Sequence, residues 1–173
     1  MDKKELADIR EITDVIYRYA RGVDRRDLEL VRACFHPDAY DDHGAISGNV
    51  DELLRQIEAF VSRYDLTYHF IGNVLVEVFG DVARAESYAI AVHRREPVAG
   101  REGKHDTWGI RYVDRFERRG GEWRIAYRVV AREWRTVLKL PESDIGRGSF
   151  VPRSREGGAE PLEWILERRS PGR

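Results

Sequence analysis

Apolar residues recur at steps of three and four between Glu5 and Asp24, which predicts an amphipathic helix with one buried stripe. The stripe consists of Leu6, Ile9, Ile12, Ile16, Tyr19 and Val23. Gly22 offers a C-terminal stop, so the turn after it would have to fold Asp24 back toward the buried side. Tyr19 and Asp24 are therefore either a core-edge tyrosine and an ordinary turn aspartate, or the beginning of a site.

Two shorter helices are predicted next, over Leu28–Phe35 and Val50–Arg63. The sequence His36-Pro37-Asp38 ends the first of them, because proline cannot continue a helix. The segment between them, Ala39–Gly48, is polar and contains several glycines. We expect it to form a short irregular strand and a turn.

Four runs of β-branched and aromatic residues follow, separated by short connections that contain glycine or proline. This pattern predicts consecutive antiparallel strands joined by hairpins. The runs are Thr67–Phe79, Val82–Arg95, His105–Arg118 and Glu122–Val137. Helices followed by strands indicate an α+β fold, and strands of this length predict a strongly curved sheet. Helices packed on the concave side of such a sheet would give a cone with a pocket inside.

The composition changes near the C-terminus, where glycine, proline, serine and arginine become frequent. We therefore divide the chain into a domain over residues 1–137 and a C-terminal arm over residues 138–173. A short helix is predicted within the arm, over Pro161–Arg168. The arm either lies over the pocket mouth or over a neighbouring subunit, or it is a flexible tail.

The composition is that of a folded soluble domain. Of the 173 residues, 42% are hydrophobic, and four Trp, eight Tyr and six Phe argue against disorder. Charged residues balance to a net charge of -1, so no long-range field favours nucleic acid or an anionic membrane. The one cysteine, Cys34, is expected to be a buried inert thiol. Without an apolar run of 18 residues or a signal peptide, we expect a cytoplasmic protein.

The five histidines show no spacing typical of a metal site, and we predict neither a metal nor another cofactor. The segment Asp41-Asp42-His43 is either a loose metal-binding group or a solvated turn. His69 lies in the first long strand, where alternation places it on one face with Ile71, Asn73 and Leu75. Both faces of this strand are mostly apolar, as expected if both are covered. His69 is then either a core histidine or a base in a dry cavity.

Alternation along the last strand separates two faces. Trp123, Ile125, Tyr127 and Val129 form a packing face, and Arg128 belongs to the opposite one. The neighbours of Arg128 on its own face, Ala126 and Val130, are small or apolar. Arg128 is therefore either a solvated guanidinium or a group that binds an anion inside the cone.

The predicted helices, strands and candidate residues, in this order, resemble the SnoaL-like branch of the nuclear-transport-factor-2-like (NTF2-like) superfamily. Its members include bile-acid 7α-dehydratase, scytalone dehydratase and hexachlorocyclohexane dehydrochlorinase. The resemblance covers about residues 5 to 135 and implies a cone-shaped barrel. The matching segments are Ile16–Asp27 (IYRYARGVDRRD), Phe35–Ala39 (FHPDA), Tyr68–Glu77 (YHFIGNVLVE) and Trp123–Arg128 (WRIAYR).

The resemblance also implies roles for individual residues. Asp24 and His69 fall where these lyases keep a His–Asp dyad, Tyr19 matches the tyrosine of the bile-acid dehydratase, and Arg128 matches an arginine used near the leaving group. Further pocket positions assigned to substrate binding are His43, His93 and Trp108, although a slip of one residue would turn His93 or Trp108 outward.

The implied function is that of a cofactor-independent lyase acting on a hydrophobic cyclic or aromatic molecule. Dehydration is the first expectation, and retro-aldol loss of formaldehyde would use the same groups. The alternatives are a ketosteroid-type isomerase, a non-catalytic ligand-binding protein, and the small accessory subunit of a ring-hydroxylating oxygenase. The resemblance favours a homo-oligomer, a trimer before a dimer.

Overall fold

The computed structural model describes residues 2–44 and 47–144. It contains the predicted helices followed by a curved sheet, which confirms the α+β class. The helices are α1 (Lys3–Arg25), α2 (Leu28–Ala33) and α3 (Val50–Val61). The strands are β1 (Phe35–Asp42), β2 (Ser47–Asn49), β3 (Leu66–Phe79), β4 (Val82–Arg95), β5 (Gly103–Arg119) and β6 (Glu122–Leu140), followed by a 3₁₀ turn at Glu142–Asp144.

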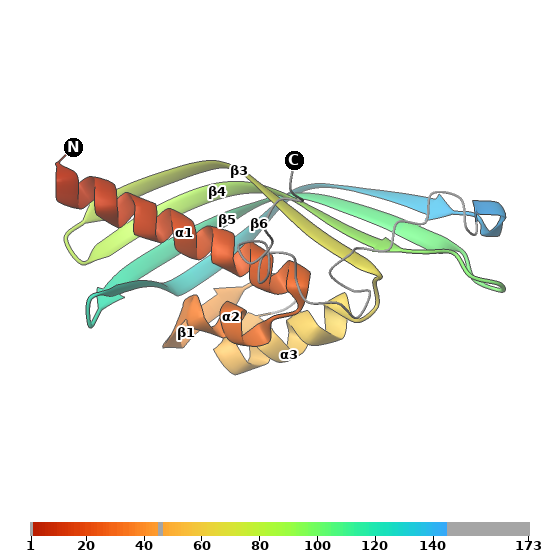
Figure 1. The fold of residues 1–173 in the computed structure, drawn as a ribbon, viewed down its shortest axis with the longest axis horizontal. Helices are drawn as coiled ribbons and strands as arrows, with labels where there is room; N and C mark the ends of the chain where they lie inside the picture. Colours follow the sequence, from red (N-terminus) through yellow and green to blue (C-terminus); the bar gives the residue numbers. More distant parts are fainter. Residues whose placement is uncertain (1, 45–46, 145–173) are drawn as a thin grey trace, which may run out of the picture.

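The strands form one open sheet in the order β2-β1-β6-β5-β4-β3. The four long strands pair antiparallel as hairpin neighbours, as predicted, and β1 joins the sheet parallel to β6. Figure 1 shows the three helices on one side of the curved sheet. This is the expected cone-shaped arrangement, in which the helices and the concave side of the sheet enclose the core.

Helix α1 continues beyond the predicted stop at Gly22. It ends after Arg25, because Arg26 adopts a left-handed conformation at φ 57°. Gly22 serves a different purpose, since a Cβ atom there would lie 2.8 Å from the Val31 side chain. It lets α1 and α2 pack closely. Asp24 therefore lies in the last turn of α1 itself, and no turn folds it back.

The chain leaves α2 earlier than predicted. The helix ends at Ala33, and Phe35 already begins β1, so the sequence around Pro37 lies in a strand. The pairing of β1 with β6 shifts register between Phe35 and Tyr40, and this irregularity accommodates a proline without a backbone N–H. Cys34, between α2 and β1, is buried as predicted, and burial raises the pKa of its thiol to about 11.

Helix α3 is held at both ends. Asn49 and Glu52 form a reciprocal capping box at its start. At its end, the guanidinium of Arg26 donates to the carbonyl oxygens of Val61 and Tyr64, at 3.1 and 2.7 Å. The end of α1 is thereby tied to the end of α3.

A bulge in β3 changes which residues point inward. The pairing with β4 shifts between Ile71 and Val74, so the less exposed positions change phase after the bulge. The prediction that placed Asn73 and Leu75 on the His69 face is wrong, and Leu75 is 63% exposed. The expectation that both faces are covered is also wrong, because Tyr68 and Phe70 point outward and are more than half exposed.

A second bulge, in β6, brings Arg128 to the packing face. Ile125 pairs with Phe116 and Tyr127 with Arg115, so Ala126 is an extra residue in β6. Simple alternation predicts that Arg128 lies on the face opposite to Ile125. This prediction is wrong, because both side chains are buried.

Arg128 is neither solvated nor surrounded only by apolar groups. Its Nε and Nη2 atoms each donate to a carboxylate oxygen of Asp114 at 2.7 Å, and both side chains are fully buried. The guanidinium lies 4.2 Å from the ring centres of both Tyr19 and Tyr112. A charged pair therefore stands in the middle of the hydrophobic core.

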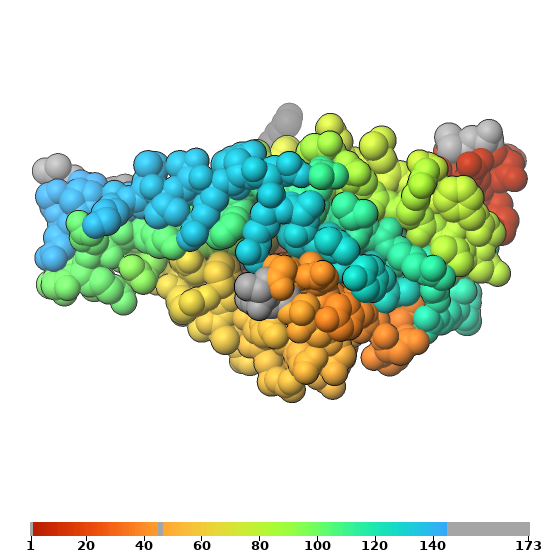
Figure 2. All heavy atoms as spheres, turned by 180° about the vertical axis from the view of Figure 1, so that it is seen from behind, coloured from red at the N-terminus to blue at the C-terminus, as the bar shows by residue number. Residues whose placement is uncertain are grey.

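The far ends of β5 and β6 project beyond the helices (Figures 1 and 2). Strand β6 continues through Leu140, three residues past the expected domain boundary at 137, and its residues from Glu133 to Lys139 are exposed. The helix predicted over Pro161–Arg168 lies outside the described residues. No helix in the described part of the chain is long and apolar enough to cross a membrane.

Replacing Arg128 by methionine should lower the free energy of unfolding by about 3–5 kcal/mol, because it leaves the buried Asp114 carboxylate without its partner. Urea unfolding followed by circular dichroism measures this. Arg124→Met is the matched control, since Arg124 pairs with Glu122 at the surface and should change stability by about 0.5 kcal/mol or less. Equal effects of the two variants would contradict a stabilising role for the buried pair.

Candidate active site

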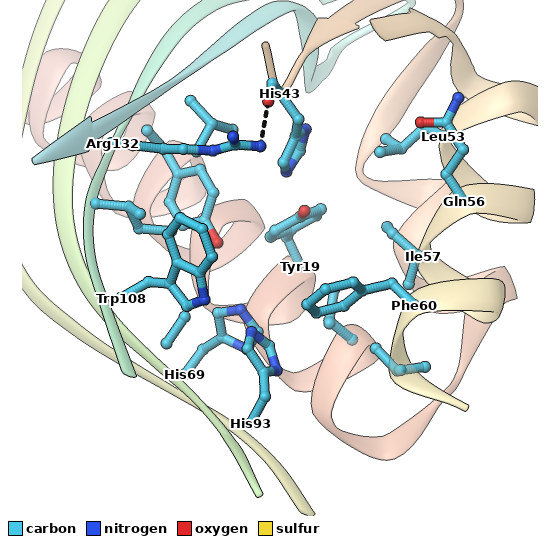
Figure 3. Close-up of a pocket in the computed structure, with 16 residues that line it drawn as sticks. Tyr19, His43, Leu53, Gln56, Ile57, Phe60, His69, His93, Trp108 and Arg132 are labelled. Atoms are coloured by element: carbon cyan, nitrogen blue, oxygen red, sulfur yellow. Dashed lines mark hydrogen bonds between the residues drawn. The ribbon is translucent and has the colours of Figure 1, made fainter. Parts of the chain in front are cut away.

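A pocket of about 140 Å³ lies between α1, α3 and the concave side of the sheet (Figure 3). Cavities of about 150 Å³ hold a benzene molecule, so this one has room for a single ring. Most of its wall is aliphatic or aromatic. The residues that line it are Tyr19, Val23, His43, Leu53, Gln56, Ile57, Phe60, Val61, His69, Ala91, His93, Trp108, Ile110, Tyr112, Val130 and Arg132.

His69 and Asp24 form a hydrogen-bonded pair at the edge of this pocket. The ring Nδ1 of His69 lies 2.7 Å from Asp24 Oδ1, and the backbone N–H of His69 donates to Asp24 Oδ2 at 2.8 Å. Both side chains are about nine-tenths buried. Because an ionised carboxylate only accepts hydrogen bonds, Nδ1 of His69 donates to Asp24, and the neutral form of this tautomer has its lone pair on Nε2.

Tyr19 lies in the pocket wall, five residues before Asp24 on α1. Burial is the largest influence on its hydroxyl and raises the pKa well above the usual range, although Arg128 opposes this. Tyr19 therefore keeps its proton and presents a neutral O–H. A neutral phenol can donate a hydrogen bond to an oxygen in the pocket.

Arg128, the fourth predicted catalytic residue, is not among the residues that line the pocket. It lies beneath Tyr19 and Tyr112, where it is paired with Asp114. The guanidinium in the pocket wall belongs to Arg132, which sequence reasoning did not select although it shares the expected strand face of Arg128. Arg132 donates to the backbone carbonyl of His43 at 2.6 Å (Figure 3).

His93 and Trp108 both line the pocket, together with His43. The His93 ring packs against the rings of Phe60, Tyr64 and His69 at centre distances of 4.8, 5.3 and 5.8 Å. Burial, followed by the nearby His69, lowers the pKa of His93 to about 3, so this imidazole is neutral at physiological pH. Within the described residues, neither His93 Nδ1 nor Trp108 Nε1 has a hydrogen-bond partner.

The segment Asp41-Asp42-His43 does not form a solvated turn. The Nδ1 atom of His43 donates to Asp41 Oδ1, and Asp41 is only 2% exposed. The sequence carried only a weak signal for this, because Asp41 and His43 are two residues apart but β1 ends at Asp42. No group of three potential metal ligands comes together in the described part of the chain.

The sequence profile of the SnoaL-like domain matches residues 4–129. The chain belongs to the SnoaL-like family. Uncharacterized proteins from Mycobacterium tuberculosis and Mycobacterium bovis are 29% identical to it over 137 residues, which make up 78% of this chain and 91% of each relative.

Solved structures share the fold of this SnoaL-like protein. A candidate scytalone dehydratase from Novosphingobium aromaticivorans superposes with a TM-score of 0.70 at 19% identity, over 79% of this chain and 91% of the other. A hexachlorocyclohexane dehydrochlorinase from Novosphingobium barchaimii superposes with a TM-score of 0.68 at 22% identity, over 85% and 96% of the two chains. At these identities the similarity establishes the architecture and leaves the reaction to be argued from the site.

The neutral His93 should make this SnoaL-like protein sensitive to acid. Between pH about 6.5 and about 3 the unfolded chain binds a proton at this position that the folded protein does not, so stability falls as the pH is lowered. The contribution is at most about 1.4 kcal/mol per pH unit. Urea unfolding between pH 7 and pH 4 should show a shallower loss for His93→Phe than for the wild type. The control His105→Phe, outside the pocket lining, should keep the wild-type slope; an unchanged slope in His93→Phe would show that His93 is not the group responsible.

Proposed function

We propose that this protein is a cofactor-independent lyase that acts on a hydrophobic cyclic or aromatic small molecule. The reaction is a dehydration or, with the same groups, a retro-aldol cleavage that releases formaldehyde. One observation carries the proposal: the His69–Asp24 pair meets an apolar, ring-sized pocket whose wall also contains the Tyr19 hydroxyl. An elimination needs a base at a C–H bond and a donor at the departing oxygen, and these residue types can supply both.

His69 is the proposed base. Its Nε2 lone pair accepts the proton from carbon, while Asp24 fixes the tautomer and stabilises the imidazolium that forms. General-base catalysis of this kind contributes about 10²–10⁴-fold to the rate. The apolar surroundings support this role, because the proton transfer occurs away from competing water.

Tyr19 is the proposed donor to the oxygen that becomes negative or departs. Arg128 contributes to the same step from beneath the pocket. Its guanidinium lies 4.2 Å from the Tyr19 ring centre, so its positive charge favours electron density that develops at the phenol and at any oxygen bonded to it. In this proposal Arg128 acts through Tyr19 rather than on the leaving group directly.

The pocket also indicates the substrate class. Its volume fits one ring with small substituents, and aromatic side chains form much of the wall. The unpartnered nitrogens of His93 and Trp108 are available to bind polar atoms of such a molecule. We assign both residues, with His43, to substrate binding.

A homo-oligomer, with a trimer before a dimer, is part of the same proposal. Five large apolar side chains on the long strands are between 42% and 56% exposed. They are Tyr68, Phe70, Tyr88, Ile90 and Trp134. Some of them also line a surface hollow on the outside of β3–β6, and apolar patches of this kind mark association surfaces.

His69→Ala should lower kcat/KM toward 5-nitrobenzisoxazole by about 10²-fold or more, because ring opening of this probe needs a general base at a C–H bond. Release of the coloured nitrophenolate measures the rate. His105→Ala is the matched control and should keep wild-type activity. If His69→Ala stays active while folded, the base assignment is wrong. A wild-type protein that binds the probe without turnover would instead support the ligand-binding alternative.

Tyr19→Phe should lower kcat for the same probe by about 10-fold while KM changes little, because the hydroxyl bonds more strongly to the developing phenolate than to the neutral ground state. Steady-state kinetics separates the two parameters. Tyr17→Phe, on the exposed side of α1, is the control. Unchanged kinetics in Tyr19→Phe would assign its hydroxyl to packing alone.

A further inference from the structure

The pocket contains a second histidine–carboxylate pair, which the proposed base mechanism does not use. His43 lines the pocket and its Nδ1 donates to Asp41 at the end of β1. In Figure 3, His43 and His69 project into the pocket from opposite sides, with Tyr19 between them. Two histidines of this kind could serve a reaction that takes a proton at one end of a molecule and gives a proton at the other.

The charges around Asp41 distinguish the two pairs. Asp41 pairs in register with Arg128 across β1 and β6, and Arg128 already donates two hydrogen bonds to Asp114. Asp41, Asp114 and Arg128 are each at most 2% exposed. With both carboxylates ionised, these three buried side chains carry one negative charge in excess, which a second proton on His43 balances. Another cation beside His43 is Arg132, whose side chain is exposed and donates to the His43 backbone carbonyl. An uncompensated buried charge is costly.

The hydrogen bonds of the two carboxylates also distinguish the two pairs. Asp41 Oδ2 has no hydrogen-bond partner among the described residues, so His43 is the only donor that the structure gives this carboxylate. Asp24 instead accepts two hydrogen bonds from His69, one from the ring and one from the backbone. In the pocket, His69 lies beside His93, whose lowered pKa keeps that ring neutral. Different surroundings are what assign a base role to one group and an acid role to another.

We propose that His43 is the general acid of this site and that Asp41 is its positioning residue. The inference rests on the proposed lyase function and deepens it. It assigns the substrate to cyclic compounds that carry a hydroxyl or carbonyl oxygen at the His43 end and an acidic C–H bond at the His69 end.

In the resulting elimination, one proton passes from the substrate to His69 and one passes from His43 to the departing oxygen. His69 Nε2 takes the proton from carbon, and the electron pair of that C–H bond forms the new C=C bond. The C–O bond breaks with its electrons on oxygen, which takes the proton from His43 Nε2 and leaves as water. The enzyme then carries its proton on His69 rather than on His43, and exchange with solvent water restores the starting state.

A probe that can only accept hydrogen bonds separates the two histidines. The carbonyl of 4-(dimethylamino)benzaldehyde accepts but does not donate, and its absorption band moves to longer wavelength when its oxygen is hydrogen-bonded. A protonated His43 can donate to it, whereas the free Nε2 lone pair of His69 cannot. Titration of the full-length protein with this aldehyde therefore reports on the donor.

The wild type should bind the aldehyde with a saturable red shift. His43→Leu should remove more than half of the shift and weaken binding about 10-fold, the value of a charge-assisted hydrogen bond. The matched control His105→Leu, outside the pocket lining, should change either quantity less than twofold, and His69→Leu should keep the larger part of the red shift. If His43→Leu does not fold, His43→Gln replaces it, because its neutral amide should give a smaller shift than the wild type. Asp41→Asn should also reduce the shift while leaving the imidazole in place.

Two outcomes would overturn the assignment of His43: an equal red shift in the wild type and in the folded His43 variants, or no saturable binding to the wild type. A shift that survives in His43→Leu and disappears in His69→Leu would assign the donor to His69 and overturn the acid role of His43. The base proposal fails separately, when His69→Ala still opens the benzisoxazole ring, and that result leaves the red shift untouched.

Discussion

The bidentate pair between Arg128 and Asp114 is the interaction on which the interior depends. Both side chains are fully buried, and the guanidinium is covered by the rings of Tyr19 and Tyr112. Separating the two charges inside the core would leave each of them uncompensated, so the pair fixes β5 and β6 in register and holds α1 against them. The floor of the pocket is therefore set by electrostatics as much as by apolar packing.

Much of the fold could be predicted from the sequence because its periodicities are strong. The stripe of α1 and the β-branched runs with glycine turns define their elements without tertiary information. The failures have a common cause. Each bulge adds one residue to a strand, and the side-chain alternation after it is reversed, as seen for Leu75 on β3 and Arg128 on β6. Gly72, inside the run of β3, is a local sign of the first bulge, whereas the segment around Ala126 contains no such residue.

The candidate site was likewise predictable from the sequence only in part. The resemblance to SnoaL-like proteins placed Asp24 with His69, and the structure brings their side chains within 2.7 Å. The Asp114 partner of Arg128 could not be predicted, because it sits on another strand and depends on the bulge. The pairing of His43 with Asp41 could not be predicted from strand alternation, because His43 lies one residue beyond β1.

The position of Asp24 in the last turn of α1 has a cost and a use. The C-terminal end of a helix carries a partial negative charge, so an acidic residue there is unfavourable by about 0.3–1 kcal/mol. The helix dipole and the carboxylate add their negative potentials at the same place, beside the His69 ring. In the proposed mechanism this negative field stabilises the imidazolium that His69 forms, so the fold would exchange helix stability for activity.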